Sequence, residues 1–407
     1  MTVLERFLRY VTYDTQADES STTYPSTGTQ LVLLRDLADE LRSLGLRDAA
    51  MDDHGYVTAT IPPTSNKRVP TIAFIAHVDT SPEMPGDNVK PIVHERYDGR
   101  DLVLPDDPTA VLRVSECPPL GDRIGDDIVT ASGTTLLGAD NKAGVAEIVT
   151  AAAHLATHPE VPHGRIRIAF TPDEEVGRGT QFFDVARFGA EYAYTMDGST
   201  RGELEYESFS ADAMTLTFIG FNTHPGYARD RMINSIKVAA DFLQQLPREM
   251  SPERTDGYEG FVHPYVLQGG GEKTTVRFIV RDFKTAALKE KEALLERLAR
   301  EAASRHGARV EMQIQEQYRN MREVLDRHPH VLEYAREAIR RAGMTVHERP
   351  IRGGTDGSKL SFMGLPTPNI FAGEHNFHSR LEWVSAQDME KAVEVIVNLA
   401  RIWEERS

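Results

Sequence analysis

Short apolar runs that end in charged residues alternate with helix-like stretches through the first half of the chain, up to about Phe209. The run "PTIAFIAHVDT" (70–80) precedes the helical pattern "NKAGVAEIVTAAAHLA" (141–156), and the strand-like "GRIRIAFTPDEE" (164–175) follows it. Alternating strands and helices are typical of α/β domains. Because ligands of open α/β sheets bind beyond the carboxyl ends of the strands, the charged residues that close these runs are candidates for a functional site.

The pattern changes between residues 210 and 317, where strand-like and helix-like stretches follow in the order βαββαβ. This order is the split βαβ arrangement of a ferredoxin-like α+β domain. The strand-and-glycine style of the first half returns in "PIRGGTDGSKLSFMGLPTPNIFAG" (350–373). We therefore predict an α/β domain with a mixed, mostly parallel sheet flanked by helices, formed by residues 1–209 and 318–407. Residues 210–317 are predicted to form the inserted α+β domain.

The composition disfavours several classes of protein. The net charge of −16 opposes an electrostatic grip on nucleic acid or an anionic membrane, since both need clustered cations. No apolar run approaches the ~18 residues that span a bilayer, and charged residues interrupt the first apolar pattern, so we expect neither a membrane span nor a signal peptide. Cys117 is the sole cysteine, which excludes an intramolecular disulfide and a thiolate-built zinc site. We expect a cytoplasmic protein.

Nitrogen and oxygen ligands stand at the ends of separate runs, which suits zinc or a similar divalent ion. Two histidines and three carboxylates would give each of two ions a histidine and a terminal carboxylate, with one carboxylate bridging both. These residues are His77, Asp140, Glu175, Asp197 and His378. A cation would also explain why three adjacent carboxylates, Asp173, Glu174 and Glu175, follow an apolar strand.

The remaining groups at these strand ends have the chemistry of general acid–base catalysis. A pair of metal ions can hold a hydroxide as a nucleophile at neutral pH. Glu174, next to a ligand, is then placed to take a proton from the water and return it to a leaving amine. Asp79, two residues after His77, could orient the imidazole of that histidine.

Each of these residues also has an ordinary structural interpretation. A lone histidine after a strand, such as His77, is commonly a surface residue. Asp140 opens a helix and could serve as its N-cap. Asp197 precedes Gly198 in a dipeptide that is frequent in turns. The metal hypothesis therefore depends on all of them together.

Several motifs together resemble the tripeptide aminopeptidases of the di-zinc aminoacylase/carboxypeptidase superfamily, over essentially the whole chain. They are "IAHVDTSPEMPGDNVKP", "TLLGADNKAGVAEI", "FTPDEEVGRG", "YTMDG", "FNTHPGYARDRMINS" and "RGGTDGSKLSFMGLPTPNIFAG". The resemblance implies the same five metal ligands, with Asp140 as the bridge, and Asp79 and Glu174 as the catalytic acids. It also implies a cis peptide bond between Asp140 and Asn141.

The resemblance further implies roles for the inserted domain, which it makes a lid and dimerisation domain. His224 would stabilise the oxyanion in the active site of a dimer partner, and Arg281 would hold a substrate carboxylate with two hydrogen bonds. We also expect Arg352 and the backbone amides of Gly353 and Gly354 to line the substrate pocket. His375 has no ligand role in the family pattern, so we expect it near the site or at the surface.

The resulting expectation is a cytoplasmic homodimer with two Zn²⁺ per subunit, for which Co²⁺ or Mn²⁺ could substitute, that releases the N-terminal residue of tripeptides. A related dipeptidase or an N-acyl amino acid amidohydrolase is the alternative within the same fold. A binding protein that has lost its metals, and a two-metal phosphatase or nuclease, are further alternatives. The complete ligand set opposes the first, and the negative net charge opposes the second.

Overall fold

The computed structural model describes residues 1–407, which form two compact units. The large unit contains residues 1–206, 323–349 and 355–407, and the inserted unit contains residues 207–322 with 350–354. The inserted unit is thus slightly wider than the predicted 210–317 and takes in a second, short segment from the glycine-rich part of the sequence. None of the helices has the length and the apolar character that crossing a membrane requires.

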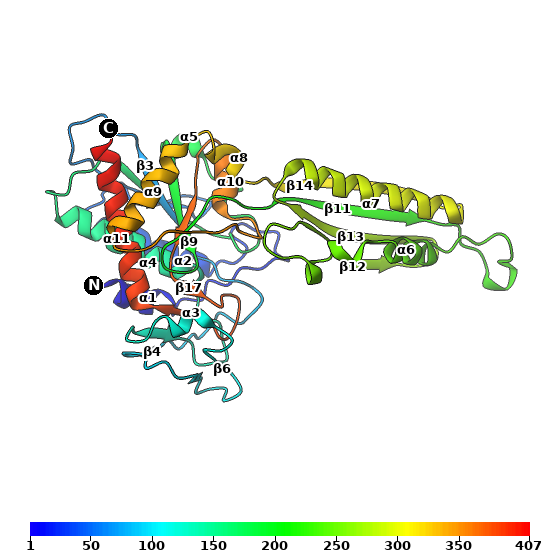
Figure 1. Cartoon of the computed structure of the whole chain (residues 1–407), viewed down its shortest axis with the longest axis horizontal. Coiled ribbons are helices and arrows are strands. Elements are labelled where there is room, and N and C mark those ends of the chain that lie inside the picture. The colour runs from blue at the N-terminus through cyan, green and yellow to red at the C-terminus, as the bar shows by residue number, and fades with distance from the viewer. The chain divides into compact units, whose positions relative to one another are not determined.

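A mixed eight-stranded sheet forms the centre of the large unit (Figure 1). In spatial order its strands are β1 (Ala50–Met51), β2 (Val57–Ile61), β8 (Ile166–Thr171), β3 (Ile72–His77), β9 (Tyr192–Gly198), β16 (Asn369–Phe371), β10 (Glu203–Glu205) and β15 (His347–Glu348). The inner strands β8, β3, β9 and β16 are parallel neighbours, as is the outer pair β10 and β15, while the other pairs are antiparallel. This sheet confirms the predicted α/β fold class.

The inner strands are buried on both faces, which is why they read as nearly continuous apolar runs. In β3 and β8 every residue is buried. Helices cover the sheet and share one hydrophobic core with it. They are α1 (Val3–Tyr10), α2 (Gln30–Ser43), α4 (Ala139–Thr157), α9 (Pro329–Arg341) and α11 (Ala386–Glu405). The shorter α5 (Val185–Phe188) and α10 (Asp356–Phe362) contribute to a separate hydrophobic cluster, and the short α8 (Arg322–Leu325) precedes α9 in the chain.

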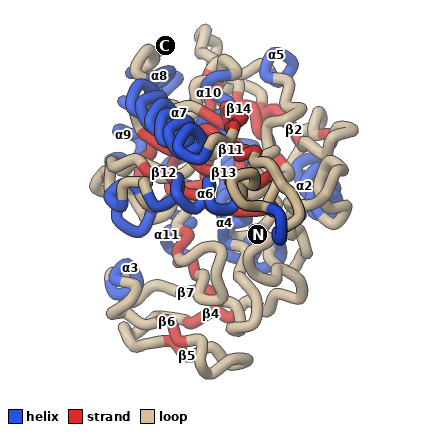
Figure 2. The backbone as a smooth tube through the Cα atoms, turned by 90° about the vertical axis from the view of Figure 1, so that its right-hand side faces the viewer, coloured by secondary structure: helices blue, strands red, loops and turns tan.

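A second, smaller sheet lies in the part of the large unit that Figure 2 shows as mostly loop. Its strands in spatial order are β17 (Glu374–His375), β18 (Trp383–Ser385), β7 (Ile128–Thr130) and β4 (Ile92–His94). Between β4 and β7 the chain forms a two-stranded sheet of β5 (Leu102–Val103) and β6 (Val111–Leu112) and the short helix α3 (Pro118–Gly121). Trp383 is fully buried in this region and donates a hydrogen bond from Nε1 to Sγ of the buried Cys117 at 3.4 Å.

The inserted unit has the predicted order βαββαβ. Its elements are β11 (Ser210–Ile219), α6 (Ser235–Gln244), β12 (Phe261–Gly269), β13 (Lys273–Asp282), α7 (Thr285–His306) and β14 (Arg309–Tyr318), with the single 3₁₀ turns η1 (Pro225–Tyr227), η2 (Arg248–Met250) and η3 (Pro252–Arg254). The four strands form an antiparallel sheet in the order β12-β13-β11-β14. Residues of alternate register, such as Met214, Leu216 and Phe218, pack with α6 and α7 into a separate core.

Candidate metal centre

The carboxyl ends of three parallel strands bring the predicted ligands together. His77 is the last residue of β3, and Asp197 is the next-to-last residue of β9. Ile75 pairs with Thr195, so His77 and Asp197 lie two residues beyond the same rung of the ladder. His77 also pairs with Thr171 at the end of β8, and Glu175 follows four residues later. The register of the sheet therefore places three candidate ligands at one edge.

The candidate ligands form two groups that overlap at one residue. His77, Asp140 and Asp197 form one group, and Asp140, Glu175 and His378 form the other, each with its ligand atoms within 4.8 Å of one another. Oδ1 of Asp140 lies 3.0 Å from Nε2 of His77, and Oδ2 lies 3.2 Å from Nε2 of His378. The two oxygens of Asp140 thus face different histidines, as a bridging carboxylate requires.

The outer carboxylates complete the two groups. Oδ1 of Asp197 lies 3.2 Å from Nε2 of His77, and Oε2 of Glu175 lies 2.9 Å from Nε2 of His378. Asp140 stands in an irregular first turn of α4, where it and Asn141 have non-helical dihedral angles, and the bond between them is cis, as the family resemblance implied. Asp140 is therefore not the N-cap of α4, a position that Gly138 occupies.

The chemistry of this cluster fits a pair of divalent cations. Burial, followed by the charge of Asp140, raises the pKa of Glu175 to about 8. Burial alone would lower the pKa of His378, but its contacts with Asp140 and Glu175 outweigh burial and raise the pKa to about 11. The cluster thus favours added positive charge. Oε1 of Glu175 is buried with no hydrogen-bond partner, and coordination by a cation would satisfy this oxygen instead.

Asp79 and Glu174 lie directly beside the ligands. Asp79 is fully buried and accepts hydrogen bonds from the backbone N–H groups of Glu174 and Glu175, both at 3.0 Å. Nδ1 of His77 lies 3.0 Å from the backbone carbonyl oxygen of Asp79 and 3.3 Å from its Oδ1, and the predicted role of the Asp79 side chain in orienting the imidazole stays a prediction. Burial raises the pKa of Glu174 well above its ordinary value, and Asp356 and Asp197 add to the shift. A raised pKa favours the protonated form of this carboxyl group.

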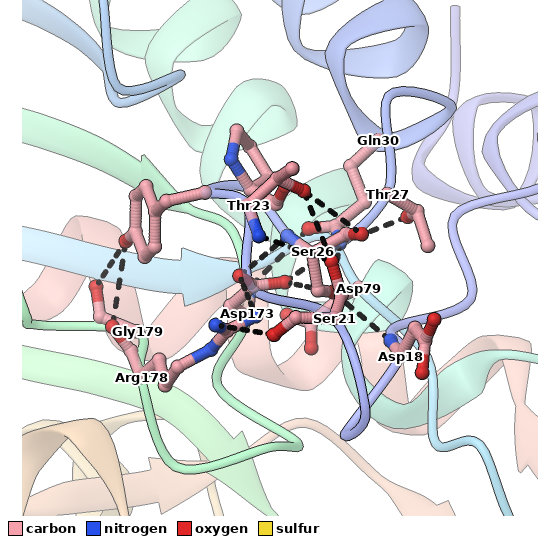
Figure 3. A network of polar contacts seen from close by, with 12 residues as sticks. Asp18, Ser21, Thr23, Ser26, Thr27, Gln30, Asp79, Asp173, Arg178 and Gly179 are labelled. Atoms are coloured by element: carbon pink, nitrogen blue, oxygen red, sulfur yellow. Dashed lines mark hydrogen bonds and ion pairs between the residues drawn. The ribbon is translucent and has the colours of Figure 1, made fainter.

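Asp173, the first of the three adjacent carboxylates, does not join either ligand group. It has a φ of 59° and turns its buried carboxylate toward the N-terminal segment (Figure 3). There it accepts hydrogen bonds from the N–H of Ser26 at 2.7 Å, from Oγ of Ser26 at 2.5 Å, from Nε2 of Gln30 at 2.8 Å and from Nη2 of Arg178 at 3.2 Å. Hydrogen-bond donors, and not the cation that we had expected, therefore offset the negative charge of the buried Asp173 carboxylate.

Glu382 is a buried carboxylate that the sequence interpretation missed. It accepts hydrogen bonds from the backbone N–H groups of Leu137 and Gly138 through Oε2, at 2.7 and 2.8 Å, and from that of Asp140 through Oε1, at 2.9 Å. The available signal was the placement of a charged residue between Leu381 and Trp383, since a carboxylate amid large apolar side chains needs buried donors.

His375, near Glu382 in sequence, is buried and stacks on Trp383 with ring centroids 4.2 Å apart, outside both ligand groups.

Two candidate residues of the inserted unit have free bonding capacity. His224 is exposed and accepts a hydrogen bond at Nδ1 from the N–H of Gly226 at 3.1 Å, so a neutral ring carries its proton on Nε2. Arg281, on β13, donates from Nη1 to the carbonyl oxygen of Arg352 at 3.2 Å, and its buried Nε has no partner. Both side chains can therefore donate further hydrogen bonds.

Of the other three candidates of this unit, Arg352 and Gly354 serve its own packing. Arg352 donates from Nη1 to the carbonyl oxygens of Gly257 and Glu259 and from Nη2 to Thr255, so its guanidinium ties down the 255–259 loop. A Cβ atom at Gly354 would come within 2.7 Å of the ring of Tyr318, which explains the glycine. Gly353 has no such close neighbour. The predicted substrate contacts of Arg352, Gly353 and Gly354 stay predictions.

Comparisons with known proteins find similar sequences over the whole chain. Residues 126–402 match the model of peptidase family M20/M25/M40. Peptidase T of Geobacillus thermodenitrificans is 50% identical over 406 residues, which cover 100% of this chain and 99% of that protein.

Solved structures share the fold at low sequence identity. A tripeptidase from Staphylococcus aureus has a TM-score of 0.78 at 20% identity, covering 99% of this chain and 98% of the other. A dinuclear metal-binding peptidase of the M20 family from Bacillus subtilis has a TM-score of 0.67 at 16% identity, covering 99% and 98%. On the extent of the family match and the full-length relative, this chain belongs to peptidase family M20/M25/M40.

Proposed function

We propose that the chain is a di-zinc aminopeptidase that releases the N-terminal residue of tripeptides. The single observation that carries this proposal is the division of the Asp140 carboxylate between two histidine–carboxylate groups. His77 and Asp197 would hold one ion, Glu175 and His378 the other, and Asp140 both. The mixed nitrogen and oxygen donors suit Zn²⁺, and Co²⁺ or Mn²⁺ can use the same ligands.

The metals, when bound, polarise a carbonyl group and lower the pKa of a bound water. The chain's own residues supply the proton transfers and the geometry. Glu174, a partly buried carboxyl group beside the ligand Glu175, takes a proton from the attacking water and gives it to the leaving amine. Asp79 fixes the backbone of Glu174 and Glu175, so the base and an adjacent ligand keep their spacing.

We assign substrate recognition and dimerisation to the inserted unit. In a homodimer, His224 would donate a hydrogen bond from Nε2–H to the oxyanion in the active site of the partner subunit. Nε2 carries the proton of the neutral ring because Nδ1 already accepts a hydrogen bond. The open donors of Arg281 suit the terminal carboxylate of a short peptide. Peptidase T proteins among the relatives and the tripeptidase among the structural neighbours support a peptide of three residues as substrate.

The test is a hydrolysis assay with free and N-blocked di-, tri- and tetrapeptides, with zinc and with a chelator. We expect the free tripeptide to be cleaved fastest and the chelator to abolish cleavage. Preferred cleavage of a dipeptide or an N-blocked substrate would instead indicate the dipeptidase or amidohydrolase alternative. The variant Glu174→Gln should keep its zinc and lose roughly 10²–10⁴ in rate. Normal turnover by that variant would remove the general-base assignment.

A further inference from the structure

The backbone that carries Asp140 leaves several N–H groups without helical partners. Residues 137 and 138 precede α4, and Asp140 and Asn141 have non-helical dihedral angles at its start. Buried backbone N–H groups need acceptors, and here a single side chain provides them. The carboxylate of Glu382 accepts the N–H groups of Leu137, Gly138 and Asp140 within 2.9 Å.

Glu382 is itself held rigidly. It is 1% exposed and directly precedes β18, whose first residue, Trp383, is fully buried. Trp383 pairs with Thr130 of β7 and with His375 of β17, so the sheet fixes the position from which Glu382 reaches the Asp140 backbone. The side chain therefore links a rigid strand to the start of α4.

The segment before Glu382 also carries a candidate metal ligand. His378 lies four residues earlier, in a loop closed by hydrogen bonds from Oγ of Ser379 to the carbonyl oxygen of Asn376 and from the N–H of Leu381 to Oγ of Ser379. The same short segment therefore presents His378 to one oxygen of Asp140 and Glu382 to the Asp140 backbone. This arrangement couples the spacing of a terminal ligand to that of the bridging ligand.

We propose that Glu382 is a positioning residue for the metal centre, which sets the Asp140 carboxylate between the two ligand groups. The inference rests on the metal centre assigned above. Partners that orient metal ligands typically contribute 10–100-fold to metal affinity. Glutamine at this position would keep one acceptor oxygen but turn an NH₂ group toward one or more of the three N–H donors. The Asp140 backbone would then lose its fixed position.

The experiment compares zinc dissociation constants of the wild type and Glu382→Gln, measured by competition with a chromophoric chelator. The control is Glu404→Gln, another buried glutamate, which accepts a hydrogen bond from Ser65 near the far end of α11. We expect Glu382→Gln to bind zinc about 10–100-fold more weakly, and the control to bind it like the wild type. Thermal unfolding of both variants measures the structural cost separately.

A zinc affinity of Glu382→Gln within about twofold of the wild type would overturn the proposal, whatever its melting temperature. If that variant does not fold, Glu382→Asp decides, because it keeps the charge on a side chain too short to reach all three N–H groups. Its zinc affinity should also fall, and an unchanged affinity would contradict the inference. If the wild type binds zinc but cleaves no peptide, the proposed function fails, while the affinities still decide the role of Glu382.

Discussion

The Asp173 network allows a stability prediction that does not depend on metal. In the variant Asp173→Asn the side chain keeps its shape, and asparagine tolerates the positive φ of 59° at this position, so no backbone cost is added. One carboxylate oxygen becomes an NH₂ donor. Oδ1 now accepts from Ser26 Oγ and Gln30, and Oδ2 accepts from Ser26 N and Arg178, so either orientation of the amide opposes two donors.

The expected cost follows from these two orphaned donors. A buried donor without its acceptor costs about 1–3 kcal/mol, so two of them cost roughly 2–6 kcal/mol. Because the Ser26 hydroxyl can rotate and amide groups can turn, we expect the lower part of that range, roughly 2–4 kcal/mol. The loss of charge beside Arg178 acts in the same direction.

Urea unfolding followed by tryptophan fluorescence measures the free energy of unfolding of the large unit, which contains Asp173. The chain has two tryptophans, Trp383 and Trp403, and both lie in the large unit with Asp173. The matched control is Asp53→Asn, at an exposed turn of the same unit. If the free energy of unfolding of Asp173→Asn lies within about 0.5 kcal/mol of that control, the network does not stabilise the turn as reasoned.

Two further predictions concern buried positions of α4. A Cβ atom at Gly144 would overlap the carbonyl oxygen of Met196 and the side-chain oxygen of Asn141, which adjoin the candidate ligands Asp197 and Asp140. We expect Gly144→Ala to lower the free energy of unfolding by about 1–3 kcal/mol or more and to weaken zinc binding. In the control Gly28→Ala the added methyl group enters open space, so its free energy of unfolding and its zinc affinity should match those of the wild type. Glu147 is fully buried with neither oxygen paired, and burial, together with Asp388, raises its pKa well above the ordinary value. The folded chain therefore keeps this proton to higher pH than the unfolded chain, and wild-type stability falls as the pH rises above the ordinary value of 4.5. The stability advantage of Glu147→Gln over the wild type should thus be larger at about pH 8 than at about pH 5 in urea titrations, and an equal difference at both pH values would contradict the assignment.

The large elements of the fold could be predicted because burial on both faces leaves a dense apolar signal. Strands β3, β8 and β9 are of this kind, and the rule that parallel strands end at one edge then brought His77, Glu175 and Asp197 together. The small sheet around β7 was not predicted, since strands of two or three residues carry too little pattern.

The supporting polar network could not be predicted from local sequence. Asp173 bonds to Ser26 across 147 residues, and Glu382 bonds to Asp140 across 242. No helical or strand periodicity links positions so far apart, so only the folded chain shows that these carboxylates share the task of neutralising buried backbone donors. Arg352 shows the same limit, because its hydrogen-bond partners in the 255–259 loop lie more than 90 residues away in sequence.

The account depends most directly on Asp140 serving two metal ions at once. Calorimetric titration of zinc into metal-free protein, with the wild type and Asp140→Ala side by side, tests this dependence. We expect two tightly bound ions per wild-type chain and loss of tight binding at both sites in the variant, because each group loses a ligand. A single ion in the wild type, or an Asp140→Ala chain that still binds two ions tightly, would contradict the shared-aspartate centre.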